Sequence, residues 1–203
     1  MTIALIGATG FIGSRLLKEL SDRGHAVTAI ARDTARVPAL PGVTAKAGDI
    51  HDGPALTAIL AGHAVVISSV HYLATDPDVL LSAVKAAGPE RYLVVGGAGS
   101  LLVAPGARLV DQPGFPAEYR AEALKGAEYL ERLQAEPTLD WTFLSPSAEI
   151  FPGERTGRFR LGGDEVLFAE DGTSRISAED YAVALADEIE TPKHRRARFT
   201  VGY

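Results

Sequence analysis

The fold is decided by the N-terminal stretch TIALIGATGFIG, residues 2–13. The apolar run at 2–6 predicts a buried strand, and Ile12, Leu16, Leu17 and Leu20 then recur at helical spacing. Between strand and helix stand three glycines, each three residues apart, which allow a tight turn, a close approach to a pyrophosphate and close packing of helix on sheet. The stretch predicts a dinucleotide-binding loop whose contacts come from Gly7, Thr9, Gly10, Phe11, Ile12 and Gly13.

The same alternation of strand and helix continues along the chain. Apolar runs predict strands over 2–6, 26–31, 43–47, 64–70, 91–96, 140–144 and 198–202. Amphipathic stretches predict helices over 12–24, 53–61, 77–87, 117–135 and 178–189, with Asp52 and Ser177 as caps. Near-continuous apolar strands alternating with helices are typical of a parallel sheet covered on both faces. We therefore expect an α/β fold: a single Rossmann-like, doubly wound domain over residues 1–203.

Two stretches, 97–116 and 145–175, are rich in glycine and proline and lack periodicity. Each follows the carboxyl end of a predicted parallel strand, which is where ligands bind in open α/β sheets. We expect these segments to be the substrate loops. They leave no room for a separate substrate domain.

Composition narrows the classes of function. The 203 residues contain no cysteine, which excludes disulfides, thiolate metal sites and cysteine nucleophiles, and no metal site is predicted. The net charge of −6 predicts no general attraction to nucleic acid or membranes, and the basic run at 193–198 is interpreted as a solvated turn. With no signal peptide or membrane span, a cytoplasmic protein is expected. Its expected partner is a small-molecule substrate, with a homodimer as an open alternative.

Arg32 follows the second predicted strand, where an NAD-binding protein places an acidic residue on the ribose 2′-hydroxyl. A guanidinium there suits a 2′-phosphate by charge and by bidentate geometry, with Arg15 and Arg36 as secondary contacts. Asp33 is interpreted as a helix cap. The sequence thus favours NADP over NAD.

Further contacts are expected at the ends of the next two strands. Asp49 and Ile50 close the third strand, where a carboxylate can accept from the adenine amino group or merely cap a turn. Ser68 and Ser69 end the fourth strand and are expected beneath the cofactor. His71 comes just beyond and is a weak candidate for a catalytic or substrate role, with polar surface as the alternative.

Several stretches together resemble a known family. They are GATGFIG (7–13), GDIHD (48–52), VVGGAGSL (94–101), DWTFLSP (140–146) and RISAEDYA (175–182). The chain resembles an atypical short-chain dehydrogenase/reductase, in the NmrA-like NAD(P)-binding set that is often named NADH-flavin reductase and is related to biliverdin-IXβ reductase. The resemblance covers essentially the whole chain. It implies a Rossmann domain, a bound nicotinamide dinucleotide and reductase activity.

The chain departs from the wider superfamily at the catalytic Tyr-x-x-x-Lys pair. Tyr119 is followed four positions later by Ala123, and Lys125 lies on a different face of the predicted helix. Ser100 stands where the superfamily has a serine, and Ser100 and Tyr119 are weak catalytic candidates, with packing roles as the alternatives. Loss of the pair makes alcohol or ketone chemistry less favoured.

Hydride transfer from NADPH to a flavin or similar planar acceptor fits better, because the reduced ring delocalises its charge. Such an acceptor needs apolar walls. Tyr72, Ser100, Phe115, Pro146 and Phe151 are the candidate pocket residues, with core packing as the alternative for the ring side chains. A non-catalytic NmrA-like dinucleotide sensor is the leading alternative function. A sugar-nucleotide epimerase or dehydratase ranks last, since it requires the missing pair.

Overall fold

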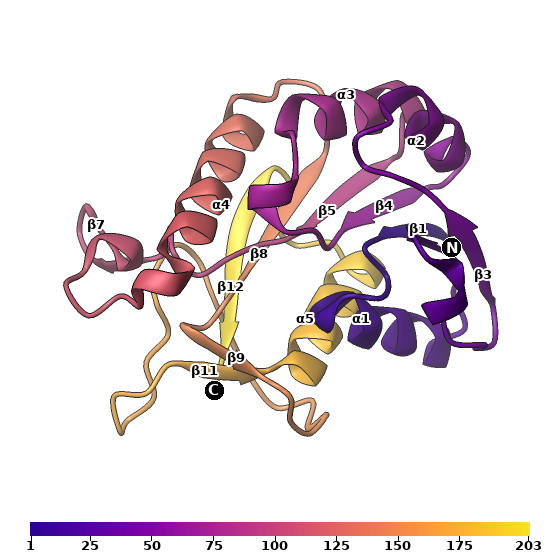
Figure 1. Ribbon diagram of the computed structural model, residues 1–203. Coiled ribbons are helices and arrows are strands. Elements are labelled where there is room, and N and C mark those ends of the chain that lie inside the picture. The colour runs from indigo at the N-terminus through magenta and orange to yellow at the C-terminus, as the bar shows by residue number, and fades with distance from the viewer.

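The computed structural model describes residues 1–203 and is built around one eight-stranded sheet in the order β10-β12-β8-β5-β4-β1-β2-β3 (Figure 1). Every neighbouring pair is parallel except β10 and β12. In chain order the strands are β1 (Thr2–Ile6), β2 (Ala26–Ala31), β3 (Val43–Ala47), β4 (Val65–Ser68), β5 (Arg91–Val95), β8 (Trp141–Pro146), β10 (Arg160–Gly162) and β12 (Ala197–Gly202). The order 3-2-1-4-5, extended by β8 and β12, is that of a Rossmann sheet, which confirms the predicted fold class.

Helices cover both faces of this sheet, as Figure 1 shows. Residues of α1 (Phe11–Asp22) and α5 (Ala178–Glu190) share one buried cluster with the sheet. Residues of α2 (Gly53–Leu60), α3 (Pro77–Ala87) and α4 (Ala117–Ala135) share the other. Because both faces are buried, the inner strands are apolar along their whole length rather than alternating.

The helix ends follow local chemistry that is readable in the sequence. The carboxylate of Asp52 accepts from the Ala55 N–H at 3.1 Å, and Ser177 Oγ accepts from the Asp180 N–H at 3.0 Å, so both predicted caps are confirmed. Gly88 ends α3 in the left-handed conformation, with φ of 65°. These caps explain why the predicted helix bounds agree with the structure to within two residues.

The structure adds short strands in the two stretches predicted to be loops. β6 (Leu102–Ala104) pairs with β7 (Ala107–Arg108), and β9 (Glu149–Phe151) pairs with β11 (Arg175–Ser177). Besides these two pairs, the short strand β10 extends the main sheet. Strands of two or three residues are too short to carry a periodic pattern, and partners such as Glu149 and Arg175 lie far apart in sequence.

The basic run at 193–198 forms the turn into β12, as predicted, and three of its side chains have acidic partners within the chain. Arg195 pairs with Asp140, Arg198 pairs with Asp164 at 2.6 Å, and His194 Nδ1 lies 2.8 Å from Glu188. None of the helices is long and apolar enough to cross a membrane.

Candidate functional site

The glycine loop after β1 is shaped by close backbone contacts. Gly7 has φ of +78°, and a Cβ there would lie 2.0 Å from the Ser69 carbonyl oxygen. A Cβ on Gly13 would lie 2.1 Å from the Gly7 carbonyl oxygen. The N–H groups of Gly7 and Ala8 both donate to the Ile30 carbonyl, at 3.0 and 3.3 Å. The loop is therefore fixed between β2 and the end of β4, and side chains at Gly7 and Gly13 are excluded by backbone.

This loop ends at the N-terminus of α1, which is open to a ligand. No side chain caps Gly10, and the first turn holds no acidic residue. The free N–H groups and the positive end of the helix dipole together favour a bound anion. The residues present thus fit the pyrophosphate of a dinucleotide.

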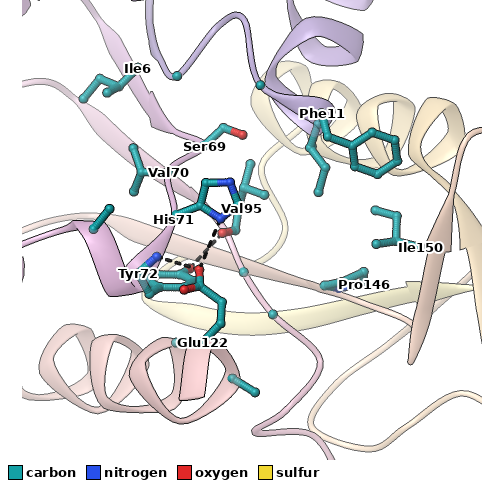
Figure 2. A pocket seen from close by; sticks show the side chains of 18 of the residues that line it. Ile6, Phe11, Ser69, Val70, His71, Tyr72, Val95, Glu122, Pro146 and Ile150 are labelled. Atoms are coloured by element: carbon teal, nitrogen blue, oxygen red, sulfur yellow. Dashed lines mark hydrogen bonds and ion pairs between the residues drawn. The ribbon is translucent and has the colours of Figure 1, made fainter. Parts of the chain in front are cut away.

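A cavity of about 960 Å³ runs from this loop along the carboxyl ends of the strands (Figure 2). It lies at the carboxyl ends of the neighbouring strands β1 and β4, between which the strand order reverses; this is the topological switch point at which such sheets bind ligands. Its walls come from the glycine loop, the ends of β2 and β3, residues 69–74, residues 95–99, the start of α4 and residues 146–150. One space therefore joins the N-terminal half of the chain to both predicted substrate loops.

Most of the residues predicted from the sequence line this cavity. They are Gly7, Thr9, Gly10, Phe11, Ile12, Arg32, Arg36, Asp49, Ile50, Ser69, His71, Tyr72, Phe115, Tyr119 and Pro146. Five predicted residues do not: Gly13, Arg15, Ser68, Ser100 and Phe151.

Each of these five lies outside the cavity for a physical reason. Arg15 donates to Glu179 at 3.1 Å. Gly13 lies under the loop, against the Gly7 carbonyl. Ser68 is buried and its Oγ lies 2.8 Å from the Tyr92 hydroxyl. Ser100 Oγ accepts from Arg198 Nη1 at 3.1 Å, and the Phe151 ring lies 4.4 Å from the Arg175 guanidinium carbon. They support neighbouring segments instead of facing the cavity.

One end of the cavity carries unpaired positive charge, and we call it the adenosine end. Arg32 and Arg36 line it, and neither forms a salt bridge. Asp33 is turned to the backbone, where its carboxylate accepts from the Ala35 N–H at 3.0 Å. Asp49 accepts from the His51 N–H at 2.9 Å. The guanidinium groups, not Asp33, thus define the charge of this end.

The opposite end, which we call the acceptor end, contains a residue that the sequence analysis missed. Glu122 on α4 accepts from the N–H groups of Tyr72 and Leu73, at 2.6 and 2.9 Å, and its carboxylate lies 3.7 Å from His71 Nδ1 (Figure 2). The His71 side chain is 91% exposed. Glu122 lies three residues after Tyr119, so both share a helix face, and that spacing was the available signal.

Buried tyrosines near the acceptor end are held neutral. Tyr72 donates its hydroxyl to the Val95 carbonyl at 2.8 Å, and burial raises its pKa well above the ordinary value. Burial likewise raises the pKa of Tyr92 to about 12. Tyr119 differs, because it is 63% exposed at the mouth of the cavity. The buried hydroxyls are therefore part of the packing and are poor proton donors.

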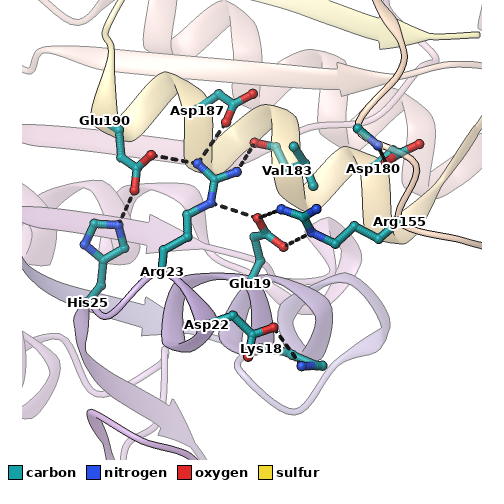
Figure 3. Close-up of polar contacts among 11 residues, drawn as sticks. Lys18, Glu19, Asp22, Arg23, His25, Arg155, Asp180, Val183, Asp187 and Glu190 are labelled. Atoms are coloured by element: carbon teal, nitrogen blue, oxygen red, sulfur yellow. Dashed lines mark hydrogen bonds and ion pairs between the residues drawn. The ribbon is translucent and has the colours of Figure 1, made fainter.

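The segment after β9 contacts α1 and α5, which cover the same face of the sheet (Figure 3). Arg155 donates two hydrogen bonds to Glu19 on α1, at 2.7 and 2.8 Å, and Arg23 donates a third at 2.8 Å. The hydrogen bond from Arg155 is the main reason that the pKa of Glu19 lies below its ordinary value, against the opposing effect of burial. Gly153 N–H donates to Glu179 on α5 at 2.8 Å. These contacts fix the loop that continues from one wall of the cavity.

Comparison with known proteins decides the family. The model of the family described as NAD(P)H-binding matches residues 7–192. The chain belongs to the NAD(P)H-binding family. This membership agrees with the atypical dehydrogenase/reductase resemblance read from the sequence.

Relatives of this NAD(P)H-binding protein match it along almost its whole length. The uncharacterized protein YwnB of Bacillus subtilis (strain 168) is 41% identical over 99% of this chain and 98% of its own. A solved structure from Bacteroides thetaiotaomicron, named as a proposed epimerase, is 42% identical with a TM-score of 0.95, over 100% of this chain and 96% of its own. A proposed NADH-flavin reductase from Streptococcus pneumoniae TIGR4 is 35% identical with a TM-score of 0.84, over 100% and 99%.

Proposed function

We propose that this protein is an NADPH-dependent oxidoreductase that passes hydride to a flavin or a similar planar acceptor. The observation that carries the proposal is the continuity of one cavity from the unpaired Arg32, past the uncapped N-terminus of α1, to the apolar walls of Phe115, Pro146 and Ile150. The name of the Streptococcus pneumoniae relative, a proposed NADH-flavin reductase, points in the same direction.

The adenosine end supplies the contacts that select the cofactor. Arg32 and Arg36 receive the 2′-phosphate of NADPH, since neither guanidinium has another partner. The backbone N–H groups at the start of α1 receive the pyrophosphate. The second carboxylate oxygen of Asp49 accepts from the adenine amino group. A cofactor held at three points is oriented with its nicotinamide toward the acceptor end.

The acceptor end positions the second substrate and supplies a proton. When bound, a dihydronicotinamide would supply the hydride, which carries both electrons of the reduction. His71 donates the accompanying proton to the acceptor, and its exposed imidazole is recharged from solvent. Glu122 positions His71, because two backbone N–H groups fix the carboxylate beside the imidazole. The apolar walls at Phe115 and Pro146 pack against the planar ring and orient it.

The superfamily's tyrosine and lysine pair is replaced here by unrelated contacts. Lys125 Nζ lies 2.6 Å from the carboxylate of its neighbour Glu128 and outside this cavity. Tyr119 therefore has no lysine to lower its pKa. A ketone or alcohol substrate depends on that activated tyrosine, whereas a flavin ring accepts hydride with only weak assistance from an acid.

The test is steady-state oxidation of NADPH with FMN and with riboflavin, followed by the loss of NADPH absorbance. Turnover well above the enzyme-free rate is expected. Gly7→Ala is the negative control, because its Cβ meets the Ser69 carbonyl and closes the cofactor loop. If NADPH binds tightly but neither flavin is reduced faster than the blank, the proposal fails, and a non-catalytic dinucleotide sensor becomes the better description.

A further inference from the structure

We infer that the acceptor of this protein is an uncharged planar molecule, and that the site discriminates against acceptors bearing a phosphate or carboxylate. The inference rests on the proposed function and names the substrate class of the same site. It is drawn from the distribution of charge along the cavity.

All the Lys and Arg side chains that line the cavity are at the adenosine end. They are Arg32 and Arg36, which follow β2. The lining of the acceptor end contributes two carboxylates, Glu122 and Glu149, and no lysine or arginine. The two arginines that bind the dinucleotide therefore lie at the end of the cavity away from the acceptor. An anionic group on the acceptor thus finds no lysine or arginine in this lining, and the imidazole of His71, which also lines it, already lies 3.7 Å from the Glu122 carboxylate.

The cations just outside the acceptor end are already engaged. Arg15 donates to Glu179 at 3.1 Å, and Arg120 donates to the Val110 carbonyl at 2.6 Å. Arg175 lies 3.9 Å from Glu149 and stacks on the Phe151 ring. To receive a phosphate, each of these side chains has to leave its present partner, and that cost offsets the attraction.

The helix N-termini near the cavity offer little attraction to an anionic group on the acceptor. The N-terminus of α1 is assigned to the pyrophosphate, and the N-terminus of α5 is capped by Ser177. The N-terminus of α4 borders the acceptor end at Pro116, but its first turn carries Glu118. A carboxylate in the first turn already complements that dipole.

Glu122 is the residue expected to contribute most to the discrimination. Its carboxylate accepts from two backbone N–H groups and is 30% exposed, so it is fixed in the wall and cannot turn away from an approaching anion. Glu149 is partly neutralised by Arg175 and adds less. Because riboflavin and FMN share one reacting ring and differ by a phosphate, they isolate this effect.

The experiment measures kcat/KM for riboflavin and for FMN at saturating NADPH and low salt. It also measures the dissociation constant of each flavin from the protein–NADP⁺ complex by flavin fluorescence. We expect riboflavin to be favoured about tenfold in both, which corresponds to about 1.4 kcal/mol. The preference should shrink as salt is raised, because a partly exposed charge is screened.

Three variants sharpen the test. Glu122→Gln should lower the preference for riboflavin about threefold, mainly through tighter FMN binding, although kcat falls for both flavins. Ala148→Lys places a cation in the acceptor end, where Ala148 lines the cavity, and should strengthen FMN binding about fivefold. Glu131→Gln is the matched control: it removes the same charge from an exposed position of α4 outside the cavity and should leave the preference unchanged.

The outcomes separate this inference from the proposed function. FMN bound or reduced as well as riboflavin overturns the inference, and leaves the reductase proposal standing if turnover is observed. Tighter binding of riboflavin without turnover of either flavin supports the charge argument but defeats the reductase proposal. Equal shifts in Glu122→Gln and Glu131→Gln also overturn the inference, since the effect is then not local to the cavity.

Discussion

The two ends of the cavity are built in different ways. The adenosine end comes from the first 51 residues: the glycine loop, whose backbone is fixed by Gly7 and Gly13, and the side chains that follow β2 and β3. The acceptor end is assembled from four separate segments: residues 69–74, residues 95–99, the start of α4 and residues 146–150. The difference teaches that the adenosine end is set largely by one region of the sequence, whereas the acceptor end depends on how distant segments pack together.

The largest effect is expected where backbone leaves no room at the adenosine end. Gly13→Ala places a Cβ 2.1 Å from the Gly7 carbonyl oxygen, so the loop has to shift. We expect a loss of about 3 kcal/mol in the free energy of unfolding and a fall of about 10 °C in Tm by calorimetry. The control is Gly10→Ala, whose Cβ would lie 3.3 Å from the same oxygen. Similar Tm values for both variants would contradict the steric account.

Arg32→Ala tests the charge of the adenosine end. Removing the guanidinium should raise the dissociation constant of NADPH about 30-fold, or about 2 kcal/mol, and change that of NADH less than about twofold. Fluorescence titration of both cofactors measures this. Arg158→Ala is the matched control, because Arg158 is exposed, forms no salt bridge and lies outside the cavity. Equal weakening of NADPH and NADH would rule out a 2′-phosphate role for Arg32.

The sheet, its helices and the glycine loop are readable from the sequence for the same local reason. The apolar run of β2 and the cap Asp52 each determine structure within a few neighbouring residues, so the sequence pattern predicts these elements correctly. Asp33 shows the same: its assignment as a cap agrees with its hydrogen bond to Ala35.

The acceptor end is harder to predict because its residues are brought together only by tertiary packing. Glu122 is unremarkable in the sequence, and its partners Tyr72 and Leu73 lie about 50 positions earlier. Ser100 and Phe151 fall in the predicted loops, but Arg198 and Arg175 engage them away from the cavity. No periodic pattern encodes which way a loop side chain turns.

Substitution of Glu19 tests the contact between α1 and the segment after β9. The carboxylate on α1 is 5% exposed and pairs with Arg155 of the segment after β9 and with Arg23. Glu19→Gln should reduce the free energy of unfolding at neutral pH by about 1.5 kcal/mol, measured by urea denaturation.

The pH dependence of that loss follows from the direction of the pKa shift. The pKa of Glu19 is lowered in the folded protein, so its contribution is complete above the unfolded value and is lost as the pH falls through the folded value. The difference between wild type and Glu19→Gln should therefore shrink below about pH 4.5. Asp22→Asn breaks an exposed pair on the same helix and should cost less than about 0.5 kcal/mol. A difference that grows on acidification would contradict the assignment.

The smallest effect is expected for the proton donor at the acceptor end. His71→Ala should lower kcat with riboflavin about fivefold, because solvent also reaches the open cavity, and leave NADPH affinity unchanged. The side chain is so exposed that its removal should not affect folding. Added imidazole should restore part of the lost rate, which a purely structural role does not predict. The control is His51→Ala, since His51 lines the same cavity but adjoins Asp49. If kcat falls equally in the two variants and imidazole does not rescue His71→Ala, then His71 is not the proton donor.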